Sequence, residues 1–340
     1  MTYIIAELGQ NHNGDIDTAY NMIEKASKSQ VNAIKLTMRD LDNEMTDDMA
    51  NSPYNSPNSY GKTYMDHRKK LELDPVDINN LCIRAKDLGV DVVITLCSST
   101  LLNKRIIREH IIPKCEYIKI ASRDITNIPL LEGIKPLDKK IIISTGMCDF
   151  FELTEALKIL YKKDVTIMHC VSKYPTEDSD ARLIRINTLK NQYGIRYRIG
   201  YSDHTMGIDA VKIAVCMGAT VIEKHMTLDP EDKGSDHKGS LTPVKFRYMR
   251  RQVNYIQEMI GLDHSLSAID GDGIKGSRIK LMRSICANRN IRKGEVFTED
   301  NLCLLSPGDG IPGNYYRNLI GKTCNSDINA KTAIKMENIK

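Results

Sequence analysis

The stretch IGYSDHTMGIDAVKIAVCMGATVIEKH, residues 199–225, contains the unit from which the whole fold is predicted. A short apolar run ends in Ser202-Asp203-His204, a helical pattern follows from Gly207 to Gly218, and a second apolar run ends in Glu223-Lys224-His225. Apolar runs this short on either side of a helix are typical of buried parallel strands in a βαβ unit. The polar residues that end both runs predict a site at the carboxyl edge of the sheet.

The same arrangement recurs along the whole chain, where short apolar runs each lead into a polar or charged residue. The eight runs cover residues 3–6, 33–34, 92–94, 117–118, 141–143, 166–168, 199–201 and 221–222. Eight such units predict an α/β fold, a (β/α)₈ TIM barrel, in which site residues stand at the carboxyl ends of the strands.

The length of the chain leaves room for a small appendage to the barrel. A TIM barrel takes roughly 250 residues, and the chain has 340, of which 41% are hydrophobic. We expect the barrel over residues 1–262, a linker over 263–282 and a small β-rich domain over 283–340. In that last part, residues 291–297 and 328–334 look like weak copies of one unit. A domain of this size is near the lower limit for folding alone.

Charge and composition exclude several classes of partner. The net charge of +4 is too small to predict binding to nucleic acid. No apolar stretch approaches the roughly 18 residues of a membrane span, so no membrane partner is expected. The nine cysteines form no C-x-x-C pair, which favours free thiols in a reducing compartment. We therefore expect a cytoplasmic protein that acts on small molecules.

Two lysines stand among the residues that follow the apolar runs, and both would point into the barrel mouth. These are Lys35 and Lys119, and an unpaired ammonium group is costly to bury. Hydroxyl groups follow other runs on the same face, at Thr95, Ser122, Ser144 and Ser202. Ammonium and hydroxyl groups together suit a phosphate or a carboxylate, although lysines at a barrel rim can also extend into solvent. No glycine-rich phosphate loop is present.

Two histidines, His204 and His225, end neighbouring strands of the predicted barrel. Neutral imidazoles side by side could hold a divalent metal, with Glu7, water or substrate completing the ligand set. Asp203 could orient one of them as a hydrogen-bond partner. The alternative is that each histidine is only hydrogen-bonded within the fold.

A long loop, residues 39–74, is predicted after the second apolar run and is rich in Asn, Asp, Ser and Pro. A long connection on this face is typical of a lid or a specificity element. His67 and Arg68 near its end could reach substrate or could be solvated surface charges. His12 and Asp236-His237 are further polar groups that we expect on the same face.

Several short motifs, taken in order, resemble the sialic acid synthases, a family that condenses phosphoenolpyruvate with a sugar. They are AELGQNHNG at 6–14, AIK at 33–35, IKIAS at 118–122, ISTGM at 143–147, HC at 169–170, YPT at 174–176, GYSDHT at 200–205 and EKH at 223–225. The resemblance covers nearly the whole chain, and residues 283–340 resemble the family's antifreeze-like (SAF) domain.

The resemblance implies a transferase of the N-acetylneuraminate synthase type, with roles for individual residues. Phosphoenolpyruvate would be bound by Lys35, Thr95, Lys119, Ser122, Ser144 and Ser202. Glu7 would act beside the reacting carbons, together with the two lysines. His204 and His225 would bind a divalent metal, usually Mn²⁺, with Mg²⁺ or Co²⁺ as alternatives. Tyr174, Asp236 and Asp124 would contact the sugar. The tail would cover the partner's site in a domain-swapped homodimer.

The departures from the family pattern fall on the side of the acceptor sugar. Thr37 and Ser172 replace a Gln and an Asn, and Arg123-Asp124 replaces Gly-Glu. Ser306-Pro307-Gly308 replaces an Arg-Pro-Gly that touches the N-acetyl group. The acceptor would be N-acetylmannosamine or another N-acylated hexosamine, and the product a sialic, legionaminic or pseudaminic type of acid or another 3-deoxy-2-keto sugar acid.

Two hypotheses that assign the chain to other classes of protein remain open on the sequence. Barrel lysines also form imines in Schiff-base aldolases, which trapping with borohydride and pyruvate would detect. The second hypothesis is a non-catalytic carbohydrate-binding protein. The full set of polar residues after the apolar runs favours an enzyme over it.

Overall fold

Two compact units make up the chain, Met1–Gly261 and Leu262–Lys340. The computed structural model describes residues 1–261 and 272–340. Each unit has a hydrophobic core of its own. Within the described residues, no helix combines the length and the apolar character that a bilayer span requires.

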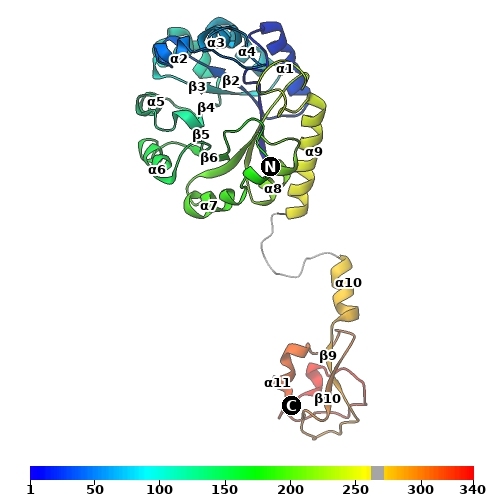
Figure 1. Cartoon of the computed structure of the whole chain (residues 1–340). Coiled ribbons are helices and arrows are strands. Elements are labelled where there is room, and N and C mark those ends of the chain that lie inside the picture. Colours follow the sequence, from blue (N-terminus) through cyan, green and yellow to red (C-terminus); the bar gives the residue numbers. More distant parts are fainter. Residues whose placement is uncertain (262–271) are drawn as a thin grey trace. The chain divides into compact units, whose positions relative to one another are not determined.

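The first unit is a closed barrel of eight parallel strands, in which each strand pairs with the next and β8 pairs with β1 (Figure 1). The strands are β1 Tyr3–Glu7, β2 Ala33–Met38, β3 Asp91–Leu96, β4 Tyr117–Ile120, β5 Lys140–Ser144, β6 Val165–Cys170, β7 Arg198–Asp203 and β8 Val221–His225. All eight predicted runs lie in these strands, and the predicted TIM barrel is confirmed. β2 continues past Lys35 to Met38, so this lysine lies within its strand and not at the end.

The interior of the barrel changes from apolar to polar along the strands. Its apolar floor is the cluster Ile5, Ala33, Val93, Tyr117, Ile142, Met168 and Val221. Side chains alternate between the two faces of a strand, so the next inward position on each strand comes two residues later. Those positions hold Glu7, Lys35, Thr95, Lys119, Ser144, Cys170 and Glu223. This polar layer therefore lies directly above the apolar floor.

Helices surround the barrel and bury the outer face of its strands (Figure 1). They are α1 Ile16–Lys28, α4 Pro75–Asp87, α5 Ile128–Ile134, α6 Phe150–Ile159, α7 Ile184–Tyr193, α8 Asp209–Cys216 and α9 Pro243–Ile260, with shorter turns at Ser99–Asn103, Ile107–Ile111, Ile112–Lys114, Ser122–Asp124 and Asp178–Asp180. The side chain of Asp74 caps α4 by accepting hydrogen bonds from the N–H groups of Val76 and Asp77. Pro75 occupies the first helical position, where its missing N–H costs nothing.

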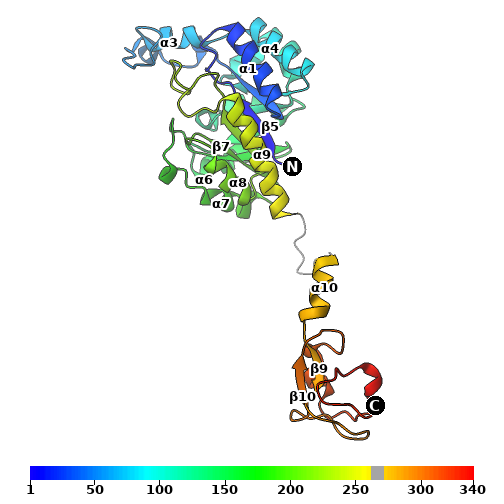
Figure 2. The same cartoon turned by 90° about the vertical axis from the view of Figure 1, so that its right-hand side faces the viewer.

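The connection between β2 and β3, residues 39–74, is here called the rim segment. The sequence predicts a long loop, but the segment contains a turn and two helices, η1 Leu41–Asn43, α2 Asp47–Asn51 and α3 Tyr64–Leu71. A capping box starts α3, because Thr63 and Asp66 each bind the other's backbone N–H through their side chains. His67 of α3 is buried against the ring of Tyr54 at a centroid distance of 4.4 Å. Figure 2 shows α3 standing out from one side of the barrel.

Gly14, in the loop after β1, lies directly against the rim segment. Its φ is +71°, and a Cβ built there would lie 1.9 Å from the carbonyl oxygen of Lys70. We expect Gly14→Ala to lower the free energy of unfolding by about 1–3 kcal/mol in chemical denaturation. Gly89→Ala is the matched control, because Gly89 has a φ of +70° but no described atom within 4 Å of its Cβ position. Equal losses in the two variants would show that contact with the rim segment is not the reason for glycine at this position.

The second unit is small and mixed in structure. Its elements are α10 Asp272–Leu281, β9 Ser284–Ala287, β10 Leu302–Leu305 and α11 Tyr316–Leu319, with turns at Gly313–Tyr315 and Met336–Asn338. β9 and β10 form an antiparallel pair, and a separate bridge joins Ile291 to Ile328. The predicted weak copies 291–297 and 328–334 therefore meet at their first residues. Helix α10 lies within the predicted linker, of which residues 263–271 are outside the described residues.

Candidate active site

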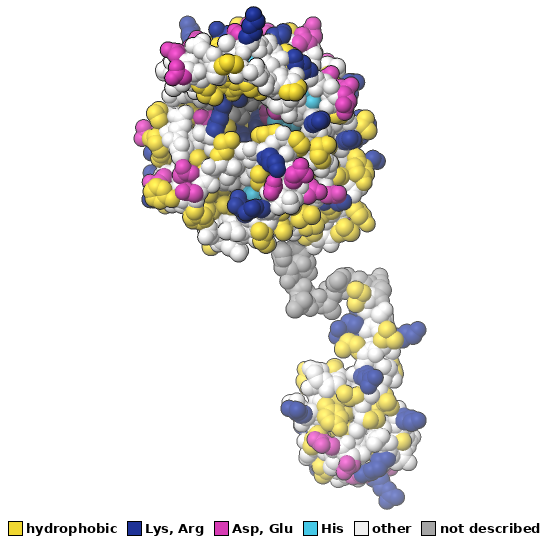
Figure 3. Space-filling model, in the orientation of Figure 1, with side chains coloured by type: hydrophobic (Ala, Val, Ile, Leu, Met, Phe, Trp, Pro, Cys, Tyr) yellow, Lys and Arg dark blue, Asp and Glu magenta, His cyan; other side chains and the backbone are white. Residues whose placement is uncertain are grey.

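An open pocket lies at the carboxyl ends of the strands, and its space of about 950 Å³ includes the mouth that is open to solvent. Figure 3 shows this face of the barrel hollowed, with Lys and Arg side chains in and around the hollow. The pocket brings together most of the residues predicted from the sequence: Glu7, Lys35, Thr95, Lys119, Ser122, Ser144, Tyr174, Ser202, His204, His225 and Asp236. Asp124 is not among its lining residues, because it borders a neighbouring cavity with Asn127.

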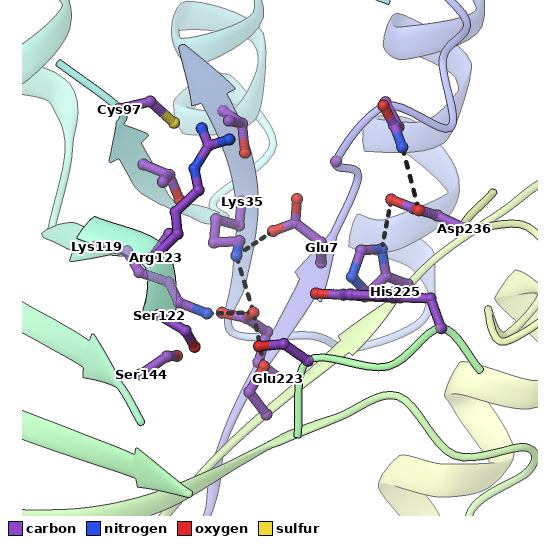
Figure 4. A pocket seen from close by; sticks show the side chains of 18 of the residues that line it. Glu7, Lys35, Cys97, Lys119, Ser122, Arg123, Ser144, Glu223, His225 and Asp236 are labelled. Carbon is purple, nitrogen blue, oxygen red and sulfur yellow. Dashed lines mark hydrogen bonds and ion pairs between the residues drawn. The ribbon is translucent and has the colours of Figure 1, made fainter. Parts of the chain in front are cut away.

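Two buried lysines and two buried carboxylates form the centre of the polar layer (Figure 4). Lys35 Nζ lies 2.6 Å from Glu7 Oε2 and 2.8 Å from Glu223 Oε1. Lys119 Nζ lies 2.5 Å from the same oxygen of Glu223. Glu223 thus joins the two lysines, a role that the sequence analysis missed. The alternation of β8 could have revealed it, because Glu223 lies two residues before His225 and faces the same way.

The electrostatics of this cluster follow from its burial. Burial lowers the pKa of Lys35 to about 7, although the nearby charge of Glu223 acts to raise it. Burial alone would raise the pKa of Glu223, but Lys119 and Lys35 outweigh it and hold that pKa well below the usual range. The cluster therefore keeps a negative charge at its centre, and a bound anion would have to share the two lysines with it.

Four hydroxyl groups surround the lysines, and two of them have no partner among the described residues. Thr95 Oγ1 and Ser144 Oγ are buried and make no hydrogen bond to any described residue. Ser202 Oγ donates to Glu223 Oε1 at 3.1 Å, and Ser122 Oγ accepts from the N–H of Gly146 at 2.9 Å. An unpaired buried hydroxyl is costly, so the two free groups indicate a ligand with oxygen atoms.

Gly146 keeps the pocket open beside these hydroxyl groups. A Cβ built on it would lie 2.4 Å from Ser172 Oγ and 2.9 Å from Ser122 Oγ. A larger residue would therefore push both serines away from the polar layer.

The two predicted metal ligands face each other on the other side of the pocket, with ring centroids of His204 and His225 5.4 Å apart. His204 Nδ1 lies 2.7 Å from the carbonyl oxygen of Val171, so it carries the proton and leaves Nε2 free. Burial lowers the pKa of His204 to about 3 and that of His225 to about 4, so both rings are neutral at pH 7. Two neutral rings, of which that of His204 has one nitrogen fixed by a carbonyl, fit a metal site.

The described residues supply only part of a metal's ligand set. They contain no group of three or more His, Cys, Asp and Glu side chains arranged to hold a metal ion. The two imidazoles would therefore need oxygen ligands from substrate or water to complete the coordination of a divalent ion.

Tyr174 and Asp236 lie against the histidine pair. The Tyr174 ring is 4.1 Å from that of His204, between centroids, and contacts His225 edge-on at 5.7 Å. Asp236 Oδ2 is 3.7 Å from His225 Nδ1, while its Oδ1 accepts a 3.1 Å hydrogen bond from Gln10 Nε2. Two of the three predicted sugar contacts thus border the histidine pair.

Asp203 does not orient a histidine, so that part of the sequence analysis was wrong. Its Oδ2 lies 2.6 Å from Lys224 Nζ, and its Oδ1 accepts a hydrogen bond from the Tyr201 hydroxyl at 2.9 Å. Asp203 and Lys224 are fully buried, on the outer side of strands whose next residues are His204 and His225. The ion pair therefore joins the ends of β7 and β8 on the outer side of the barrel.

Three arginines, Arg39, Arg68 and Arg123, complete the lining at the mouth of the pocket. The sequence predicts that Arg68 could reach substrate, and its side chain lines the pocket. No motif marks Arg39, and Arg123 stands out in the sequence only as a departure from the family pattern. His12 also lines the pocket, whereas His67 does not.

Comparisons with known proteins agree with this geometry. Residues 22–265 match the NeuB family, and residues 283–340 match the SAF domain. The chain is 35% identical to N,N'-diacetyllegionaminic acid synthase of Campylobacter jejuni, over 94% of this chain and 95% of that protein. It is 31% identical to N-acetylneuraminate-9-phosphate synthase of Drosophila melanogaster, over 94% of this chain and 91% of that protein.

A solved structure supports the same assignment. The N-acetylneuraminic acid (sialic acid) synthetase of Leptospira borgpetersenii superimposes with a TM-score of 0.68 at 31% identity, covering 81% of this chain and 90% of that one. As its motifs predicted, the chain belongs to the NeuB family and carries a SAF domain after the barrel.

Proposed function

We propose that the protein is a nonulosonic acid synthase, which condenses phosphoenolpyruvate with an open-chain N-acylated hexosamine and releases phosphate. The observation that carries the proposal is the polar layer, where two buried lysines stand beside two buried hydroxyl groups that lack a described partner. This arrangement suits a small molecule with both a phosphate and a carboxylate. The names of the relatives supply the class of product, because each denotes a synthase of a nonulosonic acid or its phosphate.

The reaction divides between the two sides of the pocket. Lys35 and Lys119, with Thr95, Ser122, Ser144 and Ser202, would hold phosphoenolpyruvate in position above the apolar floor. C3 of phosphoenolpyruvate would attack the sugar aldehyde to form the carbon–carbon bond. Water would then add at C2, and phosphate would leave with cleavage of its bond to that carbon. Glu7, from its place beside Lys35, would serve as a base or as an orienting group.

The histidine pair gives the acceptor side its chemistry. His204 and His225 would hold a divalent metal, Mn²⁺ in the first place and Mg²⁺ or Co²⁺ otherwise, which as a Lewis acid would polarise the aldehyde. Tyr174 and Asp236 would position the sugar chain next to it.

The acceptor is either N-acetylmannosamine or a modified hexosamine. Of the two relatives named above, the one with the higher identity to this chain is a legionaminic acid synthase, which favours a modified hexosamine. Thr37 and Ser172 both line the pocket, so the departures from the family pattern lie where they can alter sugar choice.

We further propose a cytoplasmic homodimer in which the SAF domain of one subunit covers the site of the other. All nine cysteines are free thiols in the structure, as a reducing compartment requires. The pocket is open, and a domain that covered it would exclude water from the charged reactants bound inside.

The proposal is tested by phosphate release from phosphoenolpyruvate, with Mn²⁺ and then with a chelator. The acceptors would be N-acetylmannosamine, its 6-phosphate, mannose, arabinose 5-phosphate and the legionaminic and pseudaminic acid precursors. Metal-dependent release with a hexosamine is the expected result. Trapping of pyruvate by borohydride would instead support the Schiff-base aldolase, and no binding of phosphoenolpyruvate would overturn the synthase.

The pKa of Lys35 predicts how the reaction depends on pH. Because burial lowers that pKa to about 7, the ammonium group is lost as the pH rises past this value. We expect kcat/KM for phosphoenolpyruvate to fall between about pH 7 and 9, since that ratio reports groups of the free enzyme. Lys35→Arg keeps its charge at every pH in this range and should show a lower but flat profile. The same decline in the arginine variant would assign the titration to another group.

A further inference from the structure

Three guanidinium groups gather at the mouth of the pocket from separate parts of the chain. Arg39 follows β2, Arg68 belongs to α3, and Arg123 lies in the turn after β4. Their side chains are 17%, 7% and 34% exposed, and all three line the pocket. Figure 4 shows Arg123 beside Cys97, on the other side of Lys35 from His225 and Asp236.

Among the described residues, the carboxylates of the rim segment do not occupy every N–H donor of these arginines. Glu44 Oε1 binds both Arg39 Nη1 at 2.5 Å and Arg123 Nη2 at 2.6 Å. Glu72 Oε1 likewise lies 2.8 Å from Arg68 Nη2 and 3.5 Å from Arg39 Nε. Each carboxylate thus serves two arginines through a single oxygen, while an arginine carries five N–H donors.

One of the unused donors is deeply buried. Arg68 is 6% exposed, and its Nε makes no hydrogen bond to any residue that the structure describes. Its Nη1 donates to Gln10 Oε1 at 2.6 Å, and Gln10 in turn binds Asp236. Gln10 therefore holds Arg68 in place from the side of the pocket where His204 and His225 lie. The Nε–H group of Arg68 is left without an acceptor among the described residues.

From this we propose that Arg39, Arg68 and Arg123 form an anion subsite, and that the acceptor sugar carries a phosphate or a carboxylate at the end remote from its aldehyde. The inference rests on the proposed function, because it assumes that the aldehyde end lies at His204 and His225. A sugar chain anchored there would extend toward the rim segment. Planar guanidinium groups match the oxygens of phosphate and carboxylate by two parallel hydrogen bonds.

The bound anion is the acceptor's and not that of phosphoenolpyruvate. We assign phosphoenolpyruvate to Lys35 and Lys119, which project from β2 and β4 above the apolar floor. Two of the three arginines, Arg39 and Arg68, lie in the rim segment.

The test compares three acceptors that differ at one position: an N-acylhexosamine, its 6-phosphate, and its 6-carboxylate. We expect one of the charged acceptors to have a KM about 10- to 100-fold below that of the neutral one, and Arg123→Gln to remove most of this advantage. The phosphate and carboxylate arms identify which anion is preferred. Arg105→Gln is the control, because that arginine pairs with Glu109 on the surface and its side chain is 83% exposed.

A paired variant separates binding from a structural role. If Arg123 only balances Glu44, then Glu44→Gln with Arg123→Gln restores the KM for the charged acceptor. If it binds the anion, the pair does not restore it, whereas Arg123→Lys does so in part. A wild type that prefers the neutral sugar, or a loss confined to the KM for phosphoenolpyruvate, would overturn the subsite.

Failure of the proposed function would look different. No acceptor would then release phosphate, and the subsite would be tested by calorimetry with N-acetylmannosamine and its 6-phosphate in the absence of phosphoenolpyruvate. Tighter binding of the phosphate ester, lost in Arg123→Gln, would support the subsite. Equal binding of both sugars would reject it.

Discussion

Glu223→Ala is expected to lower the free energy of unfolding by about 3–5 kcal/mol and to abolish turnover. The carboxylate accepts from Lys35 at 2.8 Å and from Lys119 at 2.5 Å, and all three side chains are at most 8% exposed. Removing it leaves Lys119 without its buried counter-charge and Lys35 with Glu7 alone. Chemical denaturation measures the stability, and phosphate release from phosphoenolpyruvate measures the turnover.

The pH dependence of this loss has a definite sign. The folded pKa of Glu223 lies below its unfolded value of about 4.3, so its contribution is complete above that pH and is lost as the pH falls. The stability difference between wild type and Glu223→Ala should therefore narrow below about pH 4. Glu155→Ala is the control, since its partner Lys158 has a side chain 67% exposed and surface pairs contribute about 0–1 kcal/mol. Equal losses for the two variants would refute the role of Glu223 as a buried counter-charge.

His225→Ala is expected to reduce turnover on the order of a thousandfold while the barrel stays folded. It removes one of the two imidazoles proposed to hold the metal, and a Lewis acid contributes several kcal/mol to such a step. The loss is to be measured in the phosphate-release assay, and Mn²⁺ binding is to be measured separately by calorimetry. We expect both to fall together, because one side chain supports both.

A surface histidine provides the comparison for this variant. His110 lies exposed in the turn Ile107–Ile111, so His110→Ala should keep full activity and full metal binding. Unchanged Mn²⁺ binding in His225→Ala would contradict the metal site even if turnover were lost.

The barrel and the polar layer could be predicted because strand alternation and barrel topology leave little choice. Once residues 33–35 form a parallel strand with Ala33 in the apolar floor, Lys35 must point to the same side, two residues further along. The same rule would have corrected Asp203, because its neighbour Ser202 faces inward and Asp203 must therefore face out, toward Lys224.

What the sequence concealed depends on contacts between distant residues. Glu223 joins lysines that are 188 and 104 residues away along the chain, and no local pattern marks a carboxylate as a counter-charge. The arginine cluster was hidden for a similar reason. The direction of the rim segment follows from its packing on Gly14 and Gln10, so the sequence alone could not show where Arg39 and Arg68 would point.

The separation of the apolar floor and polar layer from the rim segment has a consequence for how such enzymes diverge. The barrel strands and the residues directly after them supply the lysines, the hydroxyl groups and the histidines, whereas the rim segment, an insert between β2 and β3, supplies Arg39, Arg68 and a few further residues of the pocket lining. If this insert contacts the acceptor as we propose, mutations in it can change the sugar preference while the barrel strands keep their sequence. The insert is accordingly the segment to exchange between homologues when an enzyme that makes a different nine-carbon acid is to be engineered.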